Sequence, residues 1–201
     1  REGACADEET IAEYIEVIQV NADKMVRLVD DLLLHALRES GRIPVELRER
    51  YSGEVLSSII RPLAHVVRTS GVEFIEPPAI PNVLVSVDAT RLEQVFSNLI
   101  ANALKHTAAG DSIRIRCDRT PDRLKIEIAD TGQGISPQDM PFVFDRYYKG
   151  QPNASPVASR NDGTGLGLSI CKTIMEAHGG SISFKSAKGE GTVFYLTLPL
   201  S

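Results

Sequence analysis

The 201-residue chain has 42% hydrophobic and 24% charged residues, the composition of a soluble globular protein of one domain, with or without an appendage. Its net charge of −5, without a basic run interleaved with aromatic residues, argues against nucleic-acid binding. Its three cysteines form no CxxC pair, and no apolar stretch approaches the roughly 20 residues that span a bilayer. These features indicate a cytoplasmic domain in a reducing compartment, without a zinc site or a disulfide framework.

Residues 8–40 carry a sustained heptad pattern. Its apolar positions alternate in spacing between four and three residues: Ile11, Ile15, Ile18, Ala22, Met25, Val29, Leu32 and Ala36. Such a seam predicts a long helix of a coiled coil or a four-helix bundle, which Gly41 and Pro44 would end. The alternative is a single amphipathic helix lying on its own domain.

The remaining chain mixes helical and strand patterns. Helices are predicted over 52–70, with a kink or break at Pro62, over 90–106 and over 166–178, with a short aromatic helix after residue 135. Strands are predicted over 72–75, 83–87, 112–118, 124–130, 181–186 and 191–198, the last two joined as a hairpin at 188–191. The fold class is therefore α/β (α+β), a two-layer sandwich of a mixed sheet and helices, preceded by the long coiled-coil-type helix.

The predicted helix over 90–106 has a polar face apart from its buried stripe. Asn98, Asn102, Lys105 and His106 follow at i, i+4, i+7 and i+8 and therefore share that face. Amide oxygens suit Mg²⁺, which keeps several waters and shares its remaining ligands with phosphates. Lys105 can supply positive charge to the same phosphates.

Two glycine-rich segments follow. In the first, Asp130 ends a strand before Gly132 and Gly134; its carboxylate could accept a hydrogen bond from an adenine amino group, although the segment also reads as an ordinary turn. In the second, Gly163-Thr-Gly-Leu-Gly-Leu168 opens a helix, where free backbone N–H groups bind anions. No Gly-Lys-Ser/Thr sequence follows, so the second segment is not a Walker motif.

The order of these pieces resembles a known family. Asn98/Asn102, Asp130-x-Gly-x-Gly, the aromatic stretch from Phe142 to Lys149, and Gly163-x-Gly-x-Gly resemble the N, G1, F and G2 boxes of two-component sensor histidine kinases. These kinases belong to the ATPase group that includes gyrase and the Hsp90 chaperones. The resemblance covers roughly residues 55–199, and residues 27–33 look like the second helix of a kinase dimerisation domain.

The resemblance implies the Bergerat fold and a binding site for ATP and Mg²⁺. Asp130 would contact the adenine amino group, Gly132 and Gly134 would wall the base, and Thr192 would support the adenine end. Asn102, with Asn98 beside it, would hold Mg²⁺, and Asn98, Lys105 and Lys149 would be catalytic. The full set expected to bind ATP is Asn98, Asn102, Lys105, His106, Asp130, Gly132, Gly134, Ile135, Tyr148, Lys149, Gly163, Thr164, Gly165, Leu166, Gly167, Leu168 and Thr192.

The family pattern is incomplete in one respect. No His-Glu/Asp-x-x-Thr/Asn-Pro motif occurs, so the chain has no phosphoacceptor histidine. Residues 1–50 are interpreted as the second helix of the dimerisation and histidine phosphotransfer domain, and residues 51–201 as the catalytic ATP-binding domain. Because the chain begins at Arg1 rather than Met, it is expected to be a piece of a longer protein, whose membrane attachment these residues leave open.

The resemblance also implies partners. In the full homodimeric protein, the γ-phosphoryl group of ATP would pass to a histidine of the protein's own dimerisation domain, and then to an aspartate of a response-regulator receiver domain. Two other hypotheses remain at this point: a signalling scaffold that works by protein contacts, and a kinase of the same fold that phosphorylates serine in an anti-sigma system.

Overall fold

The computed structural model describes residues 43–148 and 165–201, together with Tyr14 and Met25. The chain divides into two compact units, residues 1–42 and 43–201, and the elements below belong to the second. The helix predicted over residues 8–40 lies outside the described residues, except at Tyr14 and Met25, which are both helical. The sequence analysis places the domain boundary after residue 50, whereas the second unit begins at Ile43.

The second unit alternates helices with pairs of strands. In chain order its elements are β1 (Arg48–Tyr51), α2 (Ser52–Thr69), β2 (Glu73–Ile75), β3 (Leu84–Val87), α3 (Ala89–His106), β4 (Ser112–Arg119), β5 (Arg123–Asp130), the 3-10 helix η1 (Met140–Phe142), α4 (Gly167–Ala177), β6 (Ser181–Ala187) and β7 (Gly191–Pro199). The helices and strands predicted over residues 52–198 are all present, with ends that differ by a few residues. None of the described helices is long and apolar enough to cross a membrane.

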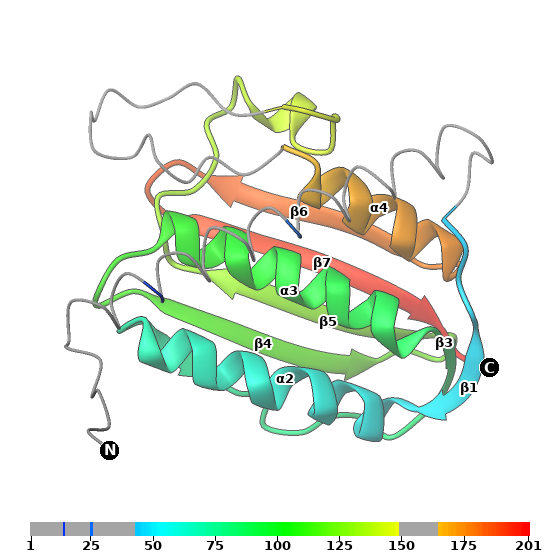
Figure 1. Ribbon diagram of the computed structural model, residues 1–201. Coiled ribbons are helices and arrows are strands. Elements are labelled where there is room, and N and C mark those ends of the chain that lie inside the picture. Colours follow the sequence, from blue (N-terminus) through cyan, green and yellow to red (C-terminus); the bar gives the residue numbers. More distant parts are fainter. Residues whose placement is uncertain (1–13, 15–24, 26–42, 149–164) are drawn as a thin grey trace, which may run out of the picture. The chain divides into compact units, whose positions relative to one another are not determined.

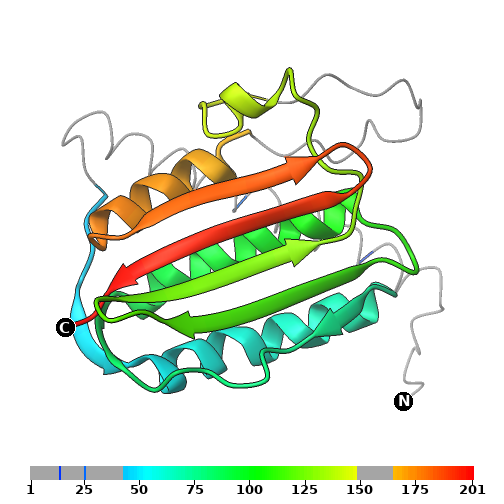
Figure 2. The ribbon, with the colours of Figure 1, turned by 180° about the vertical axis from the view of Figure 1, so that it is seen from behind.

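Five strands form one mixed sheet in the order β2-β4-β5-β7-β6. The β2–β4 pair is parallel and the other pairs are antiparallel. The helices α2, α3 and α4 all lie on one face of this sheet, and the view from behind shows the opposite face without helices (Figures 1 and 2). The predicted two-layer sandwich with a mixed sheet is confirmed.

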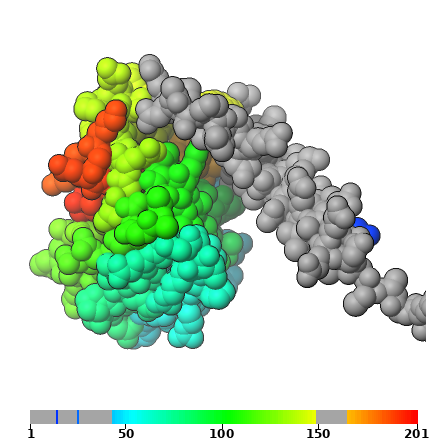
Figure 3. All heavy atoms as spheres, turned by 90° about the vertical axis from the view of Figure 1, so that its left-hand side faces the viewer, coloured from blue at the N-terminus to red at the C-terminus, as the bar shows by residue number. Residues whose placement is uncertain are grey.

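The core lies between the helical layer and the sheet. Strand β5 alternates, so that Leu124, Ile126 and Ile128 are buried while the residues between them are more exposed. Leu92, Phe96 and other apolar residues of α3 are buried at helical spacing. Each such side chain contributes about 1.5–3 kcal/mol by leaving water. Helices α2 and α3 lie side by side along the helical layer, as the space-filling view shows (Figure 3).

Strand β1 has no counterpart among the predicted elements. Its sequence, Arg-Glu-Arg-Tyr, offers no apolar alternation, and its residues are mostly exposed. The strand forms because it pairs antiparallel with β3, with Arg48 opposite Val87 and Tyr51 opposite Leu84. A strand that depends on its partner for hydrogen bonds and buries little leaves no periodic signal in its own sequence.

Helix α2 runs through Pro62 without a break, so the predicted break is wrong. Proline removes one backbone donor, which leaves the carbonyl of Ser58 without its usual helical partner. Both Pro62 and Ser58 lie on the exposed face of the helix, where water can satisfy that carbonyl. Burial of Leu56, Ile60 and Ala64 on the opposite face offsets the lost hydrogen bond.

His178 joins the end of α4 to the start of α3. It is 3% exposed, its Nδ1 contacts the carbonyl of Ile174 at 2.8 Å, and its Nε2 accepts a hydrogen bond from the backbone N–H of Asp88 at 3.0 Å. Because Nε2 accepts, the proton is on Nδ1. Asp88 caps α3 by accepting from the N–H of Arg91 and also accepts from the N–H of Glu46. His178 is also the C-cap residue of α4.

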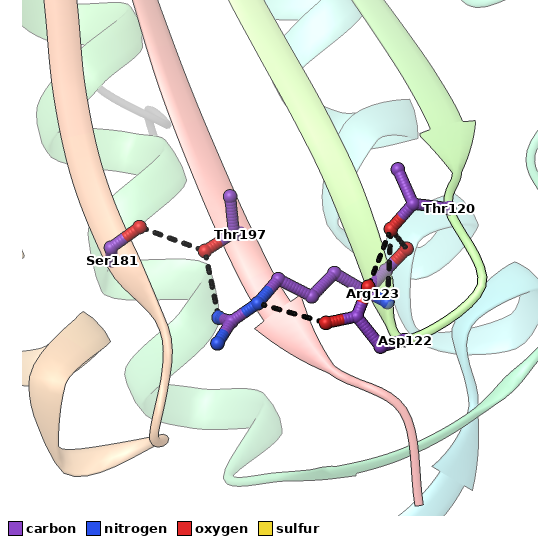
Figure 4. Close-up of polar contacts among 5 residues, drawn as sticks. All are labelled: Thr120, Asp122, Arg123, Ser181 and Thr197. Carbon is purple, nitrogen blue, oxygen red and sulfur yellow. Dashed lines mark hydrogen bonds and ion pairs between the residues drawn. The ribbon is translucent and has the colours of Figure 1, made fainter.

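A polar network closes the same end of the sheet (Figure 4). The guanidinium of Arg123, at the start of β5, donates to Thr197 Oγ1 at 3.4 Å, and that hydroxyl bonds to Ser181 Oγ at 2.8 Å. Asp122 and Thr120 hold the turn before β5. Strand β5 runs from this network toward Asp130, so the network and Asp130 lie at opposite ends of the sheet.

Candidate functional site

Asp130 is the last residue of β5 and is only 8% exposed. Its Oδ1 accepts a hydrogen bond from the backbone N–H of Gly132 at 3.0 Å. Burial raises the pKa of the Asp130 carboxyl above its ordinary value, and the negative charge of Asp111 adds to the rise, while hydrogen bonds from the backbone of Gly132 and Thr192 oppose it. A buried carboxylate held by two backbone donors is a fixed hydrogen-bond acceptor.

The turn after Asp130 packs directly on the end of α3. A side chain at Gly132 would collide with the backbone carbonyl of His106. The backbone N–H of Gln133 donates to that carbonyl at 3.0 Å. The carbonyls of the last helical turn lack partners within the helix, so this bond satisfies one of them and fixes the turn against α3. Glycine at position 132 is therefore required by close approach.

The same turn packs against the β6–β7 hairpin. Gly134 has a positive φ of 66°, and a side chain there would collide with the carbonyl of Ala187. The backbone N–H of Ile135 donates to Ser186 Oγ at 2.8 Å. Ser186 Oγ in turn bonds to the hydroxyl of Thr192 at 3.0 Å. The hairpin thereby fixes the far side of the turn.

Thr192 is opposite Asp130 in the β5–β7 register and is 5% exposed. Two residues that lie far apart in the sequence are thus neighbours on adjacent strands, on the face of the sheet that carries the helices. The sequence analysis assigns both residues to the adenine end of the site.

The polar residues of α3 lie along its second half. Asn98 and Asn102 are half-buried, and the side-chain N–H of Asn98 donates to the carbonyl of Gly167 at 3.4 Å. Lys105 is exposed, and His106 is half-buried at the end of the helix. Burial lowers the pKa of His106 below its ordinary value, and the positive charge of Lys105 lowers it further.

The start of α4 joins this group. Leu166 is 1% exposed and anchors the helix start, and Gly167 begins the helix against Asn98. Leu168 is half-buried in its first turn. Gly165 has a positive φ of 73°, and its carbonyl accepts a hydrogen bond from the N–H of Tyr147 at 2.9 Å. The first turn of α4 therefore presents its free N–H groups beside Asn98.

Tyr148 belongs to a small cluster with residues of the preceding loop. Its hydroxyl donates to Asp139 Oδ1 at 2.6 Å, and its ring contacts Phe142 at a centroid distance of 5.4 Å. The hydrogen bond to Asp139 raises the pKa of the Tyr148 hydroxyl. Lys149, Gly163 and Thr164, which the sequence analysis also assigns to ATP, lie outside the described residues.

Three residues of the site have no individual signal in the sequence. Gln133 contacts His106 with its side chain as well as its backbone, Ser186 bridges Ile135 and Thr192, and Asp139 holds Tyr148. Gln133 occupies the unspecified position of Asp-Thr-Gly-x-Gly, so the motif marks its place and not its type. Ser186 and Asp139 acquire their contacts only through tertiary folding.

The donor set available for a metal consists of amide oxygens. Among the described residues, no group of three or more His, Cys, Asp or Glu side chains could hold a metal ion. The side-chain nitrogen of Asn98 donates to the carbonyl of Gly167. The side-chain oxygen is therefore the atom of Asn98 that could contact a metal ion. Two amide oxygens on one helix face suit Mg²⁺ that takes its other ligands from phosphates and water, and do not suit a protein-only metal cage.

Residues 87–201, more than half of the chain, match the family model described as histidine kinase-, DNA gyrase B-, and HSP90-like ATPase. The sensor protein SrrB of Staphylococcus aureus is 48% identical over 114 residues, which are 57% of this chain and 19% of SrrB. The sensor protein KdpD of Clostridium acetobutylicum is 31% identical over 197 residues, 98% of this chain and 21% of KdpD. The chain spans about a fifth of the length of these relatives.

Solved structures agree on the fold. The mycobacterial sensor histidine kinase MprB superposes with a TM-score of 0.62 at 26% identity, covering 77% of this chain and 98% of MprB. Full-length ShkA in complex with AMPPNP superposes with a TM-score of 0.74 at 24% identity, covering 94% of this chain and 39% of ShkA. ThkA in complex with the response regulator TrrA gives a TM-score of 0.69 at 23% identity, covering 97% of this chain and 53% of ThkA.

The fold, the order of the motifs and the matched family model lead to one assignment. This chain belongs to the histidine kinase-, DNA gyrase B-, and HSP90-like ATPase family.

Proposed function

We propose that this chain is the ATP-binding catalytic region of a sensor histidine kinase. In the full homodimeric protein it transfers the γ-phosphoryl group of ATP to a histidine of the protein's own dimerisation domain, to which residues 1–50 contribute the second helix. The phosphoryl group then passes to an aspartate on a response-regulator receiver domain. The sensor histidine kinase MprB supports the kinase class, the sensor proteins SrrB and KdpD support a role in sensing, and the complex of the histidine kinase ThkA with the response regulator TrrA supports the class of partner.

One observation carries the proposal. The end of α3, the turn after Asp130 and the β6–β7 hairpin meet through named contacts: Gln133 with His106, and Ser186 with both Ile135 and Thr192. The start of α4 joins them through the bond between Asn98 and Gly167. Segments that are far apart in the sequence are therefore held together by hydrogen bonds around the second half of α3.

The site's chemistry fits a purine base that carries an amino group, and not a carbonyl oxygen, on its six-membered ring opposite Asp130. The Asp130 carboxylate would accept from the adenine amino group, whereas guanine offers a carbonyl oxygen at that place and would be repelled. Gly132 and Gly134 would let the base approach the backbone, and Ile135 would lie beside it. Thr192, in register with Asp130, would support the same end of the base.

The phosphates would extend toward the second half of α3. Phosphoryl transfer requires mainly alignment and neutralisation of charge. Lys105, Lys149 and His106 would face the phosphates, and the N–H groups at the start of α4 would bind their oxygens. Asn102, with Asn98, would hold Mg²⁺, which when bound spreads the negative charge of the phosphates.

Nucleotide binding is the first test. We expect the 201-residue chain to bind a non-hydrolysable ATP analogue with Mg²⁺ in isothermal titration calorimetry, and to bind the GTP analogue at least about tenfold more weakly. Asp130→Asn should lose most of the affinity, because the single amide oxygen of Asn would accept from the backbone N–H of Gly132 and leave an NH₂ group facing the adenine amino group. Asp122→Asn is the matched control, because this exposed carboxylate lies at the opposite end of β5.

Each result of this binding experiment has a different meaning. Failure of a folded sample to bind either nucleotide would overturn the catalytic assignment in favour of a scaffold that works by protein contacts. Equal loss of affinity in Asp122→Asn would show that the Asp130 effect is not local. Binding that survives in Asp130→Asn with undiminished preference for adenine would remove Asp130 from the site.

The second test addresses the reaction. The full-length protein, incubated with γ-labelled ATP, is expected to acquire label that is labile in acid and stable in alkali, as phosphohistidine is. Addition of a receiver domain should move the label to an acid-stable, alkali-labile acyl phosphate. Label that appears instead on serine would favour the anti-sigma class of kinase.

A further inference from the structure

Gln133 makes three contacts that converge on the nucleotide site. Its backbone N–H donates to the carbonyl of His106 at 3.0 Å, and its own carbonyl accepts from the N–H of Gly189 at 2.8 Å. Its side-chain nitrogen contacts Nδ1 of the His106 ring. The two backbone bonds hold the turn whatever the side chain is, so the side-chain contact is an additional feature with its own consequence.

The consequence concerns the tautomer of His106. The nitrogen of a glutamine side chain can donate but cannot accept a hydrogen bond, so Nδ1 must be the acceptor in this contact. A neutral imidazole whose Nδ1 accepts carries its proton on Nε2. Burial and the charge of Lys105 both lower the pKa of the ring, which favours the neutral form.

We infer that Gln133 is a positioning residue for nucleotide binding. Its side chain fixes the orientation of the His106 ring and keeps the proton on Nε2, so that the ring offers an N–H donor to the phosphate oxygens. This inference rests on the proposed function for the presence of the nucleotide. The tautomer itself is a property of the protein alone and can be tested without a ligand.

Two substitutions of Gln133 and one control substitution test this inference. Gln133→Met keeps a side chain of similar length but has no donor. Gln133→Glu replaces the donor with an acceptor, which would draw the proton to Nδ1. Gln138→Met is the matched control, because Gln138 is exposed and lies five residues further along the same loop. The backbone contacts of residue 133 should persist in each variant, and thermal unfolding would verify that each remains folded.

The first readout is the tautomer, measured on the 201-residue chain by long-range proton–nitrogen NMR correlation of the His106 ring above its titration range. We expect an unprotonated Nδ1 in the wild type and in Gln138→Met. Gln133→Met should show a mixture of the two tautomers, and Gln133→Glu should shift the proton to Nδ1. A wild-type ring with its proton on Nδ1 would overturn the inference, whether or not the chain binds nucleotide.

The second readout is affinity, measured by calorimetry for the ATP analogue and for adenosine. Loss of one hydrogen bond corresponds to roughly a three- to tenfold weaker binding of the ATP analogue by Gln133→Met. Adenosine affinity should change less, because the adenine contact with Asp130 is untouched. An equal loss for both ligands would point to a merely structural role and would overturn the inference.

A double-mutant cycle decides whether Gln133 acts through His106. In a His106→Leu background, Gln133→Met should cause no further loss of affinity for the ATP analogue. Full additivity of the two losses would overturn the inference. If the wild-type chain binds no ATP analogue, the proposed function fails by its own test, and with it the positioning role, whereas the NMR result still reports whether the contact sets the tautomer.

Discussion

Asp130 occupies a position that is unfavourable for a charged group. Its carboxyl is buried, and burial raises its pKa above the value in the unfolded chain. The folded state therefore binds the proton more tightly than the unfolded state does. Above the folded-state pKa, the ionised carboxylate destabilises the fold, and this loss is relieved as the pH falls toward the unfolded-state value. Such a cost in stability is common at binding sites.

The pH dependence of Asp130 gives a first prediction. At neutral pH, Asp130→Asn should be more stable to urea than the wild type, since the substitution removes the buried charge. The difference should shrink as the pH is lowered through the raised pKa of Asp130, because the wild-type carboxyl then becomes neutral too. Asp122→Asn should show no such trend. A stability difference that grows on acidification would contradict the assigned sign.

Gly132 and Gly189 are required for different reasons. Gly132 allows a close backbone contact, whereas Gly189 adopts a positive φ. A side chain at Gly132 would meet the His106 carbonyl, and its φ is not positive. Gly189 has a φ of 83°, and a Cβ added there would meet open space. Gly132→Ala should lower the free energy of unfolding by about 1–3 kcal/mol through overpacking and also weaken binding of the ATP analogue. Gly189→Ala should cost about 1–2 kcal/mol through its left-handed conformation and leave affinity nearly unchanged.

Chemical denaturation and calorimetry on both alanine variants check this pair. Equal effects on nucleotide affinity would mean that the close approach of residue 132 to α3 does not shape the site. A Gly132→Ala variant as stable as the wild type would show that the turn can move away from the helix at little cost.

At the residue scale, Asp130 and Gly132 are predicted from the chemistry of a carboxylate and of close backbone approach, and Thr192 from the family resemblance. The structure brings all three residues to one end of the sheet, and their contact with a nucleotide stays a prediction. Ser186 is not predicted, because a serine in a strand contacts Ile135 and Thr192 only when the hairpin has folded onto the turn.

At the scale of elements, the sequence predicts what periodicity encodes. Helices α3 and α4 and strands β4 to β7 carry strong apolar spacing and appear where it indicates. Strand β1 is missed because its hydrogen bonds to β3, and not its own pattern, make it a strand. The break at Pro62 is wrong because packing of the apolar face of α2 outweighs one lost hydrogen bond.

Helix α2 therefore contains a proline whose replacement should stabilise the protein. Pro62→Ala would restore the N–H that the Ser58 carbonyl lacks and should raise the free energy of unfolding by about 1–2 kcal/mol. The gain is smaller than the roughly 3 kcal/mol by which proline disfavours a helix interior, because proline also restricts the unfolded chain. Pro78→Ala, in the exposed loop after β2, is the control and should lower stability slightly. Urea unfolding measures both, and a destabilised Pro62→Ala would show that proline suits this helix.

At the scale of the whole molecule, the two ends of the sheet carry residues with different roles. Helix α3 has 18 residues and so spans about 27 Å between the Asp88 cap and His106. At one end lie Asp130, Thr192 and His106, which we propose bind the nucleotide. At the other, His178 and the Arg123 network hold helix and strand ends together. Residues at the second end should contribute to stability and not to nucleotide binding.

His178→Ala tests this separation. The substitution removes a buried ring and leaves the N–H of Asp88 without its acceptor, so the free energy of unfolding should fall by about 3 kcal/mol. Domains of this size are usually stable by 5–15 kcal/mol, so the variant should remain folded at 25 °C. Its affinity for the ATP analogue should stay within about twofold of the wild type, because the lost contacts lie about 27 Å along α3 from His106. Asp130→Asn should show the converse, with lost affinity and a stability no lower than that of the wild type, since it alters only the end of α3 where we propose that the nucleotide binds. A large loss of affinity in folded His178→Ala, measured by calorimetry beside its denaturation curve, would mean that the two ends of α3 are coupled and that the cap at Asp88 sets the position of the nucleotide-binding residues.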